Sequence, residues 1–486
     1  MSSSAPLPAD AVPPVRRIAA GTMLAYAFGA VAYGVKDSGF GTFLLLFHIQ
    51  VIGLPAATVG LVIMLALVID AIIDPAVGFF SDRTRSRWGR RHPWMYAAAL
   101  PIAVGWALLW HPPEGWGPTA TLAWLFVAAV LVRSAVSCYE VPSVALTAEL
   151  TADYDERTRI MAYRYLFGWA GGLTMLVSAY GYFLASSPAF PNGLLNRAGY
   201  GAFGLAGAVL MATAILVSAA GTHHEIKKLP KQLAAPASLR DSFGELRATV
   251  NNRGFLLLML GGVCAYTNQG VNYALSNYMY TYVWGFAGWI MALLPLVLFA
   301  GVFIAFIMAP RVARRFGKPR SATAFVLISA GFNTVPYLAR YLRLLPEMNS
   351  APGLALLLFI FMGMTAFGVS GFIVGASMMA DVVEDSEART GLRSEGVFFA
   401  GSFFVQKCTS GLGIFVAGLI LAFAGFPEAA KPGEVSPETL DRLTMIFAGM
   451  YLTLACIAAF FFSRFPFGRA EHEARVGAGA VKGSAL

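Results

Sequence analysis

Long apolar stretches alternate with short polar segments along the whole chain. A bilayer core of about 30 Å needs roughly 20 apolar residues per helix, and twelve stretches reach that length. They predict an all-α membrane protein whose twelve transmembrane helices lie near residues 18–48, 55–80, 93–111, 119–150, 160–186, 199–221, 255–284, 287–309, 321–342, 352–380, 396–425 and 440–463. Transmembrane strands are not expected, because the apolar runs are continuous rather than short and alternating.

The composition supports a polytopic membrane protein. Of the 486 residues, 57% are hydrophobic and 13% are charged, whereas a soluble domain has about a quarter charged residues. This excludes an ordinary cytosolic enzyme, a disordered chain and a disulfide-stapled secreted domain. The four cysteines lie far apart in apolar stretches, so we expect buried thiols and neither a disulfide nor a zinc site.

The basic residues orient the helices. Of the 35 lysines and arginines, 26 lie on the side of the termini and of the loops that follow every second helix, whereas five lie on the opposite side. The positive-inside rule therefore predicts an inner plasma membrane protein with both termini in the cytoplasm. This distribution explains the net charge of +9 without a nucleic-acid partner. The first helix lacks the features of a cleaved signal peptide, so we expect it to be retained.

The helix pattern repeats in two halves. A basic turn follows the second helix of each half, at 82–91 and 311–318. The predicted units are a tail (1–17), a six-helix bundle (18–221), a connector (222–254), a second bundle (255–463) and a tail (464–486). Such halves resemble the major facilitator superfamily, in which substrates bind near the midplane between halves. The turns serve as topology anchors or as salt-bridged gates at the cytoplasmic side; the candidate gating residues are Asp82, Arg83, Arg87, Arg90 and Arg315.

Eight charged residues lie inside the predicted spans and more than two residues from a span end, where each costs about 2.5–3.5 kcal/mol on insertion scales. They are Lys36, Asp37, Asp70, Asp74, Arg133, Glu140, Arg164 and Lys407. Asp70 and Asp74 share one helix face, and the span 55–80 contains no basic residue. One interpretation is a set of mutually neutralised ion pairs. The other is that Asp70 and Asp74 share a proton or hold a hard cation such as Na⁺. We expect the cation site; a separate base already paired with each acid would argue against it.

Several motifs carry a family resemblance over residues 18–465. The elements are Asp70-Ala-Ile-Ile-Asp74-Pro75, Thr84-Arg85-Ser86-Arg87-Trp88-Gly89, Gly34-Val35-Lys36-Asp37, Glu140-Val141-Pro142, the segment 381–396 and Lys407. Together they resemble the glycoside–pentoside–hexuronide:cation symporters, the family of the melibiose permease. The resemblance implies that Asp70 and Asp74 bind the cation.

The same resemblance assigns the remaining charges. Asp37, Glu140 and Arg164 correspond to sugar-binding positions, and Lys407 to the lysine that links helix 11 to the carboxylates of helices 2 and 4. Lys36 and Arg133 are expected in this charge network. Two departures stand out: Glu140 replaces an aspartate, and Val144 stands where melibiose-type members carry a tryptophan. Arg133 has two interpretations, a partner for Glu140 or a site for an anionic group on the substrate.

The seventh predicted helix is unusually polar. Tyr266 and Asn268 either line the substrate cavity or form inter-helix hydrogen bonds. The sequence contains no enzyme motif and no phosphate-binding Gly-Lys-Ser/Thr loop, so we expect a transporter, not an enzyme, with no cofactor other than a coupling cation, Na⁺ or H⁺.

We therefore predict alternating-access symport of a small hydrophilic solute, a sugar, glycoside or uronide, by a monomer. A lysophospholipid or other amphiphile on the same fold is the alternative cargo. A receptor built on a transporter fold is a third interpretation.

Overall fold

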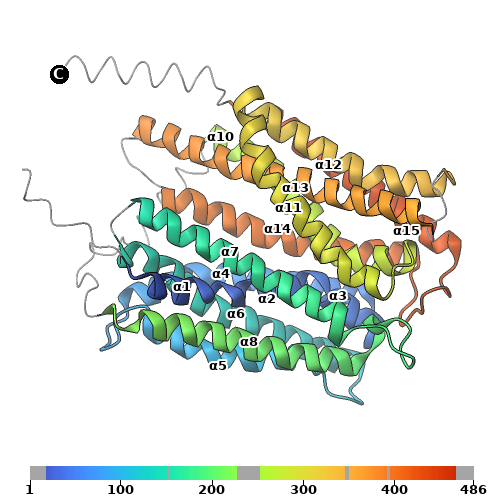
Figure 1. Cartoon of the computed structure of the whole chain (residues 1–486), viewed down its shortest axis with the longest axis horizontal. Coiled ribbons are helices and arrows are strands. Elements are labelled where there is room, and N and C mark those ends of the chain that lie inside the picture. The colour runs from blue at the N-terminus through green and yellow to red at the C-terminus, as the bar shows by residue number, and fades with distance from the viewer. Residues whose placement is uncertain (1–17, 152–153, 227–251, 345–349, 391–394, 467–486) are drawn as a thin grey trace, which may run out of the picture.

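The computed structural model describes residues 18–151, 154–226, 252–344, 350–390 and 395–466. Within these ranges the chain is a bundle of helices in two groups. Figure 1 shows the helices of the first half, α1 to α8, below those of the second half, α10 to α15, with α14 lying nearest to the first half. The tails and most of the connector 222–254 lie outside the described residues, so the predicted unit boundaries there stay predictions.

The first half comprises six spans. The first is divided into α1 (Ala20–Phe28), α2 (Ala30–Thr42), α3 (Leu44–Leu46) and the π-helix η2 (Phe47–Val51). The others are α4 (Ala56–Arg83), α5 (His92–Trp110), α6 (Pro118–Leu150), α7 (Tyr154–Ser178) continued by η3 (Ala179–Phe183), and α8 (Arg197–His223). A short 3₁₀ helix, η4 (Gly193–Leu195), precedes α8.

The second half repeats this number of spans. They are α10 (Arg253–Tyr278) continued by η6 (Met279–Val283), α11 (Trp289–Phe316), α12 (Lys318–Tyr341), α13 (Ala351–Thr390), α14 (Glu395–Ala424) and α15 (Pro437–Ser463). By length and composition, ten helices among the described residues can cross a membrane. The two further spans are the divided first one and α7, whose beginning carries Asp155, Glu156 and Arg157.

Most helix ends fall within a few residues of the predicted spans, with three exceptions, the first of which is the beginning of α7 at Tyr154 instead of 160. Helix α11 runs to Phe316 and α13 to Thr390, several residues beyond the predicted ends at 309 and 380. The prediction stopped where the apolar run stops. Charged residues do not break a helix, however, so both helices continue past the apolar layer, and α11 does so through Pro310.

The same helix pairs pack in both halves. Helix α2 packs on α7 as α10 packs on α14, and α5 packs on α8 as α12 packs on α15. Glycines allow the closest approaches. A Cβ on Gly34 of α2 would lie 1.9 Å from the carbonyl oxygen of Gly168 in α7, and one on Gly270 of α10 would lie 2.4 Å from that of Ser410 in α14. Small residues at such crossings are typical of membrane helices.

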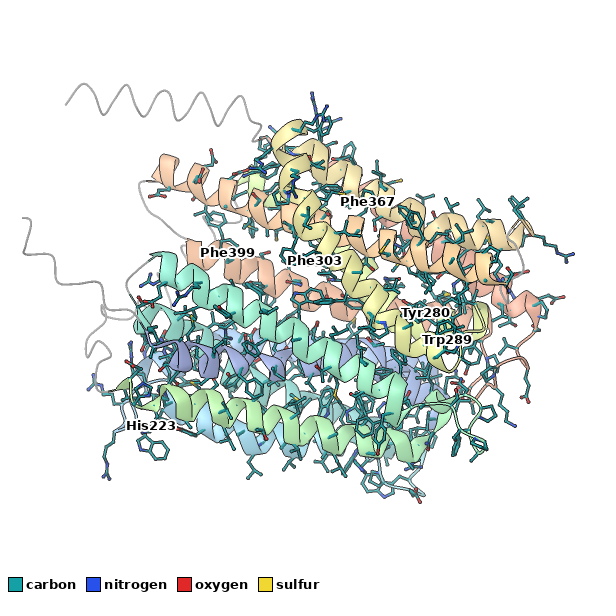
Figure 2. All side chains as sticks on the ribbon, viewed as in Figure 1. His223, Tyr280, Trp289, Phe303, Phe367 and Phe399 are labelled. Atoms are coloured by element: carbon teal, nitrogen blue, oxygen red, sulfur yellow. The ribbon has the colours of Figure 1, made fainter. Side chains whose placement is uncertain are left out.

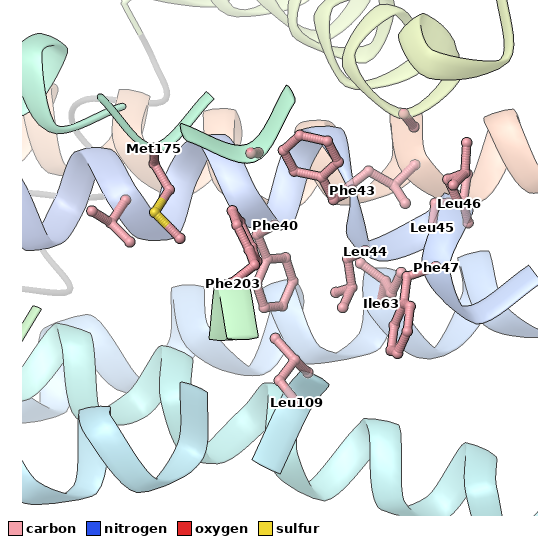
Figure 3. Close-up of a cluster of buried hydrophobic side chains, with 14 of the residues drawn as sticks. Phe40, Phe43, Leu44, Leu45, Leu46, Phe47, Ile63, Leu109, Met175 and Phe203 are labelled. Atoms are coloured by element: carbon pink, nitrogen blue, oxygen red, sulfur yellow. The ribbon is translucent and has the colours of Figure 1, made fainter. Parts of the chain in front are cut away.

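The main apolar core joins the two halves. In the first half it includes Phe40, Phe43, Phe47 and Phe203, drawn in Figure 3 from α2, its continuation and α8. Buried residues of the second half, such as Phe447, belong to the same cluster. A second cluster lies within the second half and includes Phe255, Phe325, Phe398 and Phe462.

One end of the bundle, here termed the opposite end, holds the described connecting residues 52–55, 111–117, 184–196, 284–288, 342–344 and 425–436. Several hydrogen bonds join the halves there. Asn277 Nδ2 donates to the carbonyl of Thr42 at 2.8 Å, and Gln50 binds the backbone of both Pro427 and Ala430. Tyr280 and Trp289 lie at this end in Figure 2, whereas His223 lies at the other, termed the basic end. These hydrogen bonds therefore hold the two halves together at the opposite end, which is called the sealed end below.

Candidate functional site

A buried ion pair joins α4 to α6 at mid-depth. Arg133 of α6 donates through Nε and Nη2 to Asp70 Oδ2 at 2.8 and 2.6 Å, and Ser137 Oγ donates to Asp70 Oδ1 at 2.7 Å. The Asp70 side chain is 2% exposed. In this structure the guanidinium binds Asp70 and not Glu140, the partner considered from the sequence. The other interpretation, a site for an anionic group on the substrate, stays a prediction.

A second set of ion pairs joins the two halves. Lys407 Nζ of α14 lies 2.5 Å from Asp74 Oδ2 and 3.1 Å from Asp70 Oδ2. Asp74 Oδ1 has no hydrogen-bond partner among the described residues. The Asp74 side chain is 26% exposed and that of Lys407 is 24% exposed. One ammonium group of the second half therefore lies within 3.1 Å of both carboxylates of α4.

The expectation of two unpaired acids on α4 is therefore wrong. Each carboxylate already has a base, since Arg133 binds Asp70 and Lys407 binds Asp74 and, more weakly, Asp70. The family resemblance indicated Lys407 beside these carboxylates. The local sequence pattern could not show the Arg133–Asp70 pair, because Arg133 lies on α6, 63 residues away. An arrangement of this kind holds a cation only by displacing a resident base. The described residues contain no group of three or more His, Cys, Asp or Glu side chains suited to a metal ion.

Glu140 and Arg164 form a separate pair between α6 and α7. Arg164 Nη2 donates to Glu140 Oε1 at 2.9 Å, and its Nη1 donates to Ser143 Oγ at 2.7 Å. The Arg164 guanidinium also lies 5.0 Å from the ring centroid of Tyr26. Glu140 Oε2 lacks a hydrogen-bond partner within the described part of the chain. Because this buried oxygen has no donor, it is suited to accept a hydrogen bond from a hydroxyl group of a solute.

The first span contributes Lys36 and Asp37 to the same region. Lys36 Nζ lies 3.8 Å from Asp37 Oδ1 and 4.3 Å from the ring centroid of Tyr33. The Lys36 side chain is buried, whereas that of Asp37 is 55% exposed. Asp37 is thus the most accessible carboxylate among the predicted site residues whose ion pairs are described.

Aromatic rings seven residues apart accompany the buried cations. Arg164 faces Tyr26, Lys36 faces Tyr33, and Arg133 lies 5.2 Å from the ring centroid of Phe40. These cation–π contacts compensate part of the lost hydration of each cation. Sequence reasoning missed the three rings together with Ser137 and Ser143. Their heptad spacing along the first span was the available signal for the rings, and the one-turn spacing from Arg133 and Glu140 was the signal for the serines.

Tyr266 and Asn268 of α10 lie in a different environment. The Tyr266 ring stacks on Phe372 of α13 at 5.3 Å between centroids, and Asn268 Nδ2 donates to the Tyr451 carbonyl of α15 at 3.0 Å. The structure therefore favours the inter-helix interpretation for these two residues and does not join them to the charged cluster.

The predicted gating residues form contacts inside single halves. Asp82 pairs with Arg91, which also donates to Glu149 at 2.8 Å, and Arg90 donates to the same carboxylate at 3.0 Å. Arg83 lies over the Phe79 ring, and Arg315 lies 5.3 Å from the Phe316 ring centroid. Arg87 is exposed. The network ties α4, α5 and α6 together at the basic end, and sequence reasoning missed Arg91 and Glu149 as its centre.

An apolar cavity between α5 and α6 lies away from these charges. It measures about 510 Å³ and is lined by Pro93, Trp94 and Pro101 of α5 and by Leu131 and Cys138 of α6. None of the predicted site residues lines it. We therefore build the site on the charged cluster of α2, α4, α6, α7 and α14 rather than on this apolar cavity.

Comparison with known proteins gives the family. Residues 25–469 match the family described as "MFS/sugar transport protein". An uncharacterized symporter of Synechocystis sp. is 30% identical, covering 86% of this chain and 88% of its own length. The isoprimeverose transporter of Lactiplantibacillus pentosus is 24% identical, covering 82% and 80%. The sodium-dependent lysophosphatidylcholine symporter 1 of Gallus gallus is 25% identical, covering 86% and 82%.

Solved structures confirm the predicted fold. The partially occluded inward-open form of the xylose transporter XylE from E. coli superposes with a TM-score of 0.60 at 14% identity and covers 93% of this chain and 98% of its own. The family resemblance inferred from the α4 motif and the twelve-helix architecture are thus both confirmed. The chain is an integral membrane transporter and belongs to the MFS/sugar transport protein family.

Proposed function

We propose that this protein couples a cation gradient, Na⁺ or H⁺, to the movement of a small hydrophilic solute by alternating access. One observation carries the proposal. Lys407 of the second half is held by Asp74 and Asp70 of the first half, so a cation that neutralises these acids also releases the main charged contact between the halves at mid-depth. Binding of an ion and motion of the halves are thereby linked.

The ion and the lysine compete for the same oxygens. Asp74 is the point of entry, because its Oδ1 is unbound within the described structure and its side chain is partly exposed. The expected approach of α4 to α6 on ion binding needs revision, since Arg133 and Ser137 already join these helices without an ion. The ion instead acts on the contact between α4 and α14.

The solute site lies beside the ion site. Asp37 and Glu140 offer acceptor oxygens, and Arg164 fixes the position of Glu140. This donor-and-acceptor set suits the hydroxyl groups of a sugar, glycoside or uronide. Tyr33, which is 41% exposed, supplies an aromatic face in place of the tryptophan that Val144 replaces. A relative that transports isoprimeverose supports this choice of solute class.

The membrane arrangement completes the proposal. The basic end carries most lysines and arginines, so it faces the cytoplasm of an inner plasma membrane, with both termini on that side. Because the halves are sealed at the opposite end, the solute reaches the site from the cytoplasmic side in this conformation. The transporter works as a monomer, without a nucleic-acid partner or a catalytic activity.

Transport in proteoliposomes tests the coupling. Either an imposed Na⁺ gradient or an imposed pH gradient should drive accumulation of a labelled sugar, glycoside or uronide in the wild type. Asp74→Asn should abolish gradient-driven accumulation while leaving the fold intact, because amide and carboxylate have nearly the same shape. The exposed Glu428→Gln at the opposite end serves as the matched control and should transport normally. Full gradient-driven accumulation by Asp74→Asn would refute the coupling scheme.

The alternative cargo is a lysophospholipid or another amphiphile. It is favoured by the similarity to a sodium-dependent lysophosphatidylcholine symporter and by Val144, an exposed aliphatic side chain on α6. Thermal stabilisation of the purified protein separates the two cargoes. Stabilisation by sugars or uronides supports the hydrophilic solute, whereas stabilisation by lysolipids alone supports the amphiphile.

A further inference from the structure

The two acids of α4 differ in how completely their oxygens are bound. Asp70 Oδ2 receives two hydrogen bonds from Arg133, and Asp70 Oδ1 receives one from Ser137. Both donors belong to α6, and both are buried. Lys407 Nζ lies farther from Asp70 Oδ2, at 3.1 Å. Even without Lys407, both oxygens of the Asp70 carboxylate are bound by donors of α6 before any ion arrives.

Asp74 is bound much less completely. Its Oδ2 contacts the Lys407 ammonium, and its Oδ1 is free of hydrogen bonds to described residues. About a quarter of the side chain of each partner is exposed. An incoming ion can thus reach the partly exposed Asp74 side chain, whose Oδ1 is buried but has no hydrogen-bond partner among the described residues.

The two resident bases also differ in how easily they leave. A guanidinium is weakly hydrated and binds through a rigid fork, whereas a lysine ammonium is strongly hydrated and sits on a flexible stem. Arg133 leaving Asp70 would be an unpaired guanidinium within a membrane span, because the Phe40 ring is its other described contact. Such an uncompensated buried charge is strongly unfavourable. Lys407 can instead turn toward water.

We propose that Arg133 is a permanent built-in cation on Asp70, which excludes Na⁺ from this carboxylate and makes the transporter independent of Na⁺. The inference rests on the proposed function, since it concerns the ion of the same site. A hard cation such as Na⁺ needs several oxygen ligands. Because Arg133 binds Asp70, Asp74 is the one carboxylate of the pair that remains as a ligand for an ion. Lys407 competes with the ion for Asp74.

Thermal melting of the purified full-length protein tests this without relying on transport. Melting temperatures are measured in NaCl and in choline chloride at equal ionic strength. The wild type should show no Na⁺-specific shift. Arg133→Gln, which frees Asp70, should gain a saturable Na⁺-specific rise of roughly 2 °C or more, as expected for a ligand that binds only the folded state. The double variant Arg133→Gln/Asp70→Asn should lose the gain.

Two results overturn the inference: Na⁺ stabilisation of the wild type that Asp70→Asn removes, or a folded Arg133→Gln without a Na⁺-specific shift. If Arg133→Gln does not fold, the comparison of wild type with Asp70→Asn still decides, and Arg133→Lys, which keeps a cation, should remain insensitive to Na⁺. Failure of the proposed function would be seen in a different measurement. Asp74→Asn would then still accumulate the solute along an imposed gradient, whatever effect Na⁺ has on the melting of Arg133→Gln.

Discussion

Helix α2 packs on α7 in the first half as α10 packs on α14 in the second half, yet the two halves carry different charges. Seven ionisable residues at mid-depth come from α2, α4, α6 and α7. At the same depth, the described spans of the second half contain one charged residue, Lys407. The shared packing therefore provides the scaffold, and the charges of the first half provide the chemistry.

This difference indicates how the halves divide the work. The first half holds its charges among its own helices, as in Arg133–Asp70 and Arg164–Glu140. The second half participates through one flexible ammonium, which contacts Asp74 and Asp70. A single charged link between the halves at mid-depth is easily broken and remade in each cycle, which suits alternating access.

The largest expected effect concerns the packing that both halves share. Gly34→Ala should lower the yield and melting temperature of the protein, because its Cβ would lie 1.9 Å from the Gly168 carbonyl; overpacking of this kind costs roughly 1–3 kcal/mol or more. Gly270→Ala should do the same in the second half. The control is Gly21→Ala, whose Cβ has no neighbour within 4 Å. Equal melting of Gly34→Ala and Gly21→Ala would contradict the close helix contact.

The next effect concerns the link between the halves. Lys407→Gln should reduce gradient-driven uptake about tenfold or more, because removing one partner of a buried ion pair leaves the remaining charge uncompensated. Lys431→Gln is the matched control, since Lys431 is 72% exposed in a loop at the opposite end. Initial uptake rates in proteoliposomes give the measurement. Wild-type rates for Lys407→Gln would show that the halves are coupled elsewhere.

A smaller effect is expected within the first half. Arg164→Lys keeps the charge but loses the fork that binds Ser143 and Glu140 together. We expect solute affinity to fall about tenfold, which corresponds to roughly 1.4 kcal/mol. The same substitution at Arg197, whose side chain is 41% exposed, should leave affinity unchanged because exposed ion pairs contribute little. Equal affinities for the two variants would count against Arg164 as a positioning residue.

The smallest effect concerns the sealed end. Asn277→Ala removes a donor to the Thr42 carbonyl and an acceptor for Tyr180, and each hydrogen bond is worth roughly 0.5–1.5 kcal/mol. The population open at the opposite end should therefore rise several-fold. Labelling of a cysteine introduced in place of Tyr273 by a membrane-impermeant reagent measures this, with Glu428→Gln as the background control. Unchanged labelling would show that other contacts hold the seal.

The sequence predicted the scaffold far better than the pairing of charges. Apolar runs set the helices, because hydrocarbon forces each span to satisfy its own backbone, and the motif around Asp70 and Asp74 indicated the family. Pairing depends on how helices face one another in space, which no local pattern encodes. Arg133 was therefore expected beside Glu140, seven residues away on the same helix, whereas it binds Asp70 of α4. The helix ends at Phe316 and Thr390 were missed for a different reason, because the prediction followed the apolar runs and charged residues continue both helices beyond them.

The hydrogen bonds of the Gln50 side chain determine which substitutions the opposite end can accept. Its amide nitrogen donates to the Pro427 carbonyl, and its amide oxygen accepts from the Ala430 nitrogen. Both partners are main-chain groups, which every residue provides apart from the missing N–H of proline. Most side chains of the 425–436 loop can therefore be replaced without loss of these two hydrogen bonds, whereas replacement of Gln50 removes both. At this end, substitutions should therefore be tolerated in the 425–436 loop but not at Gln50.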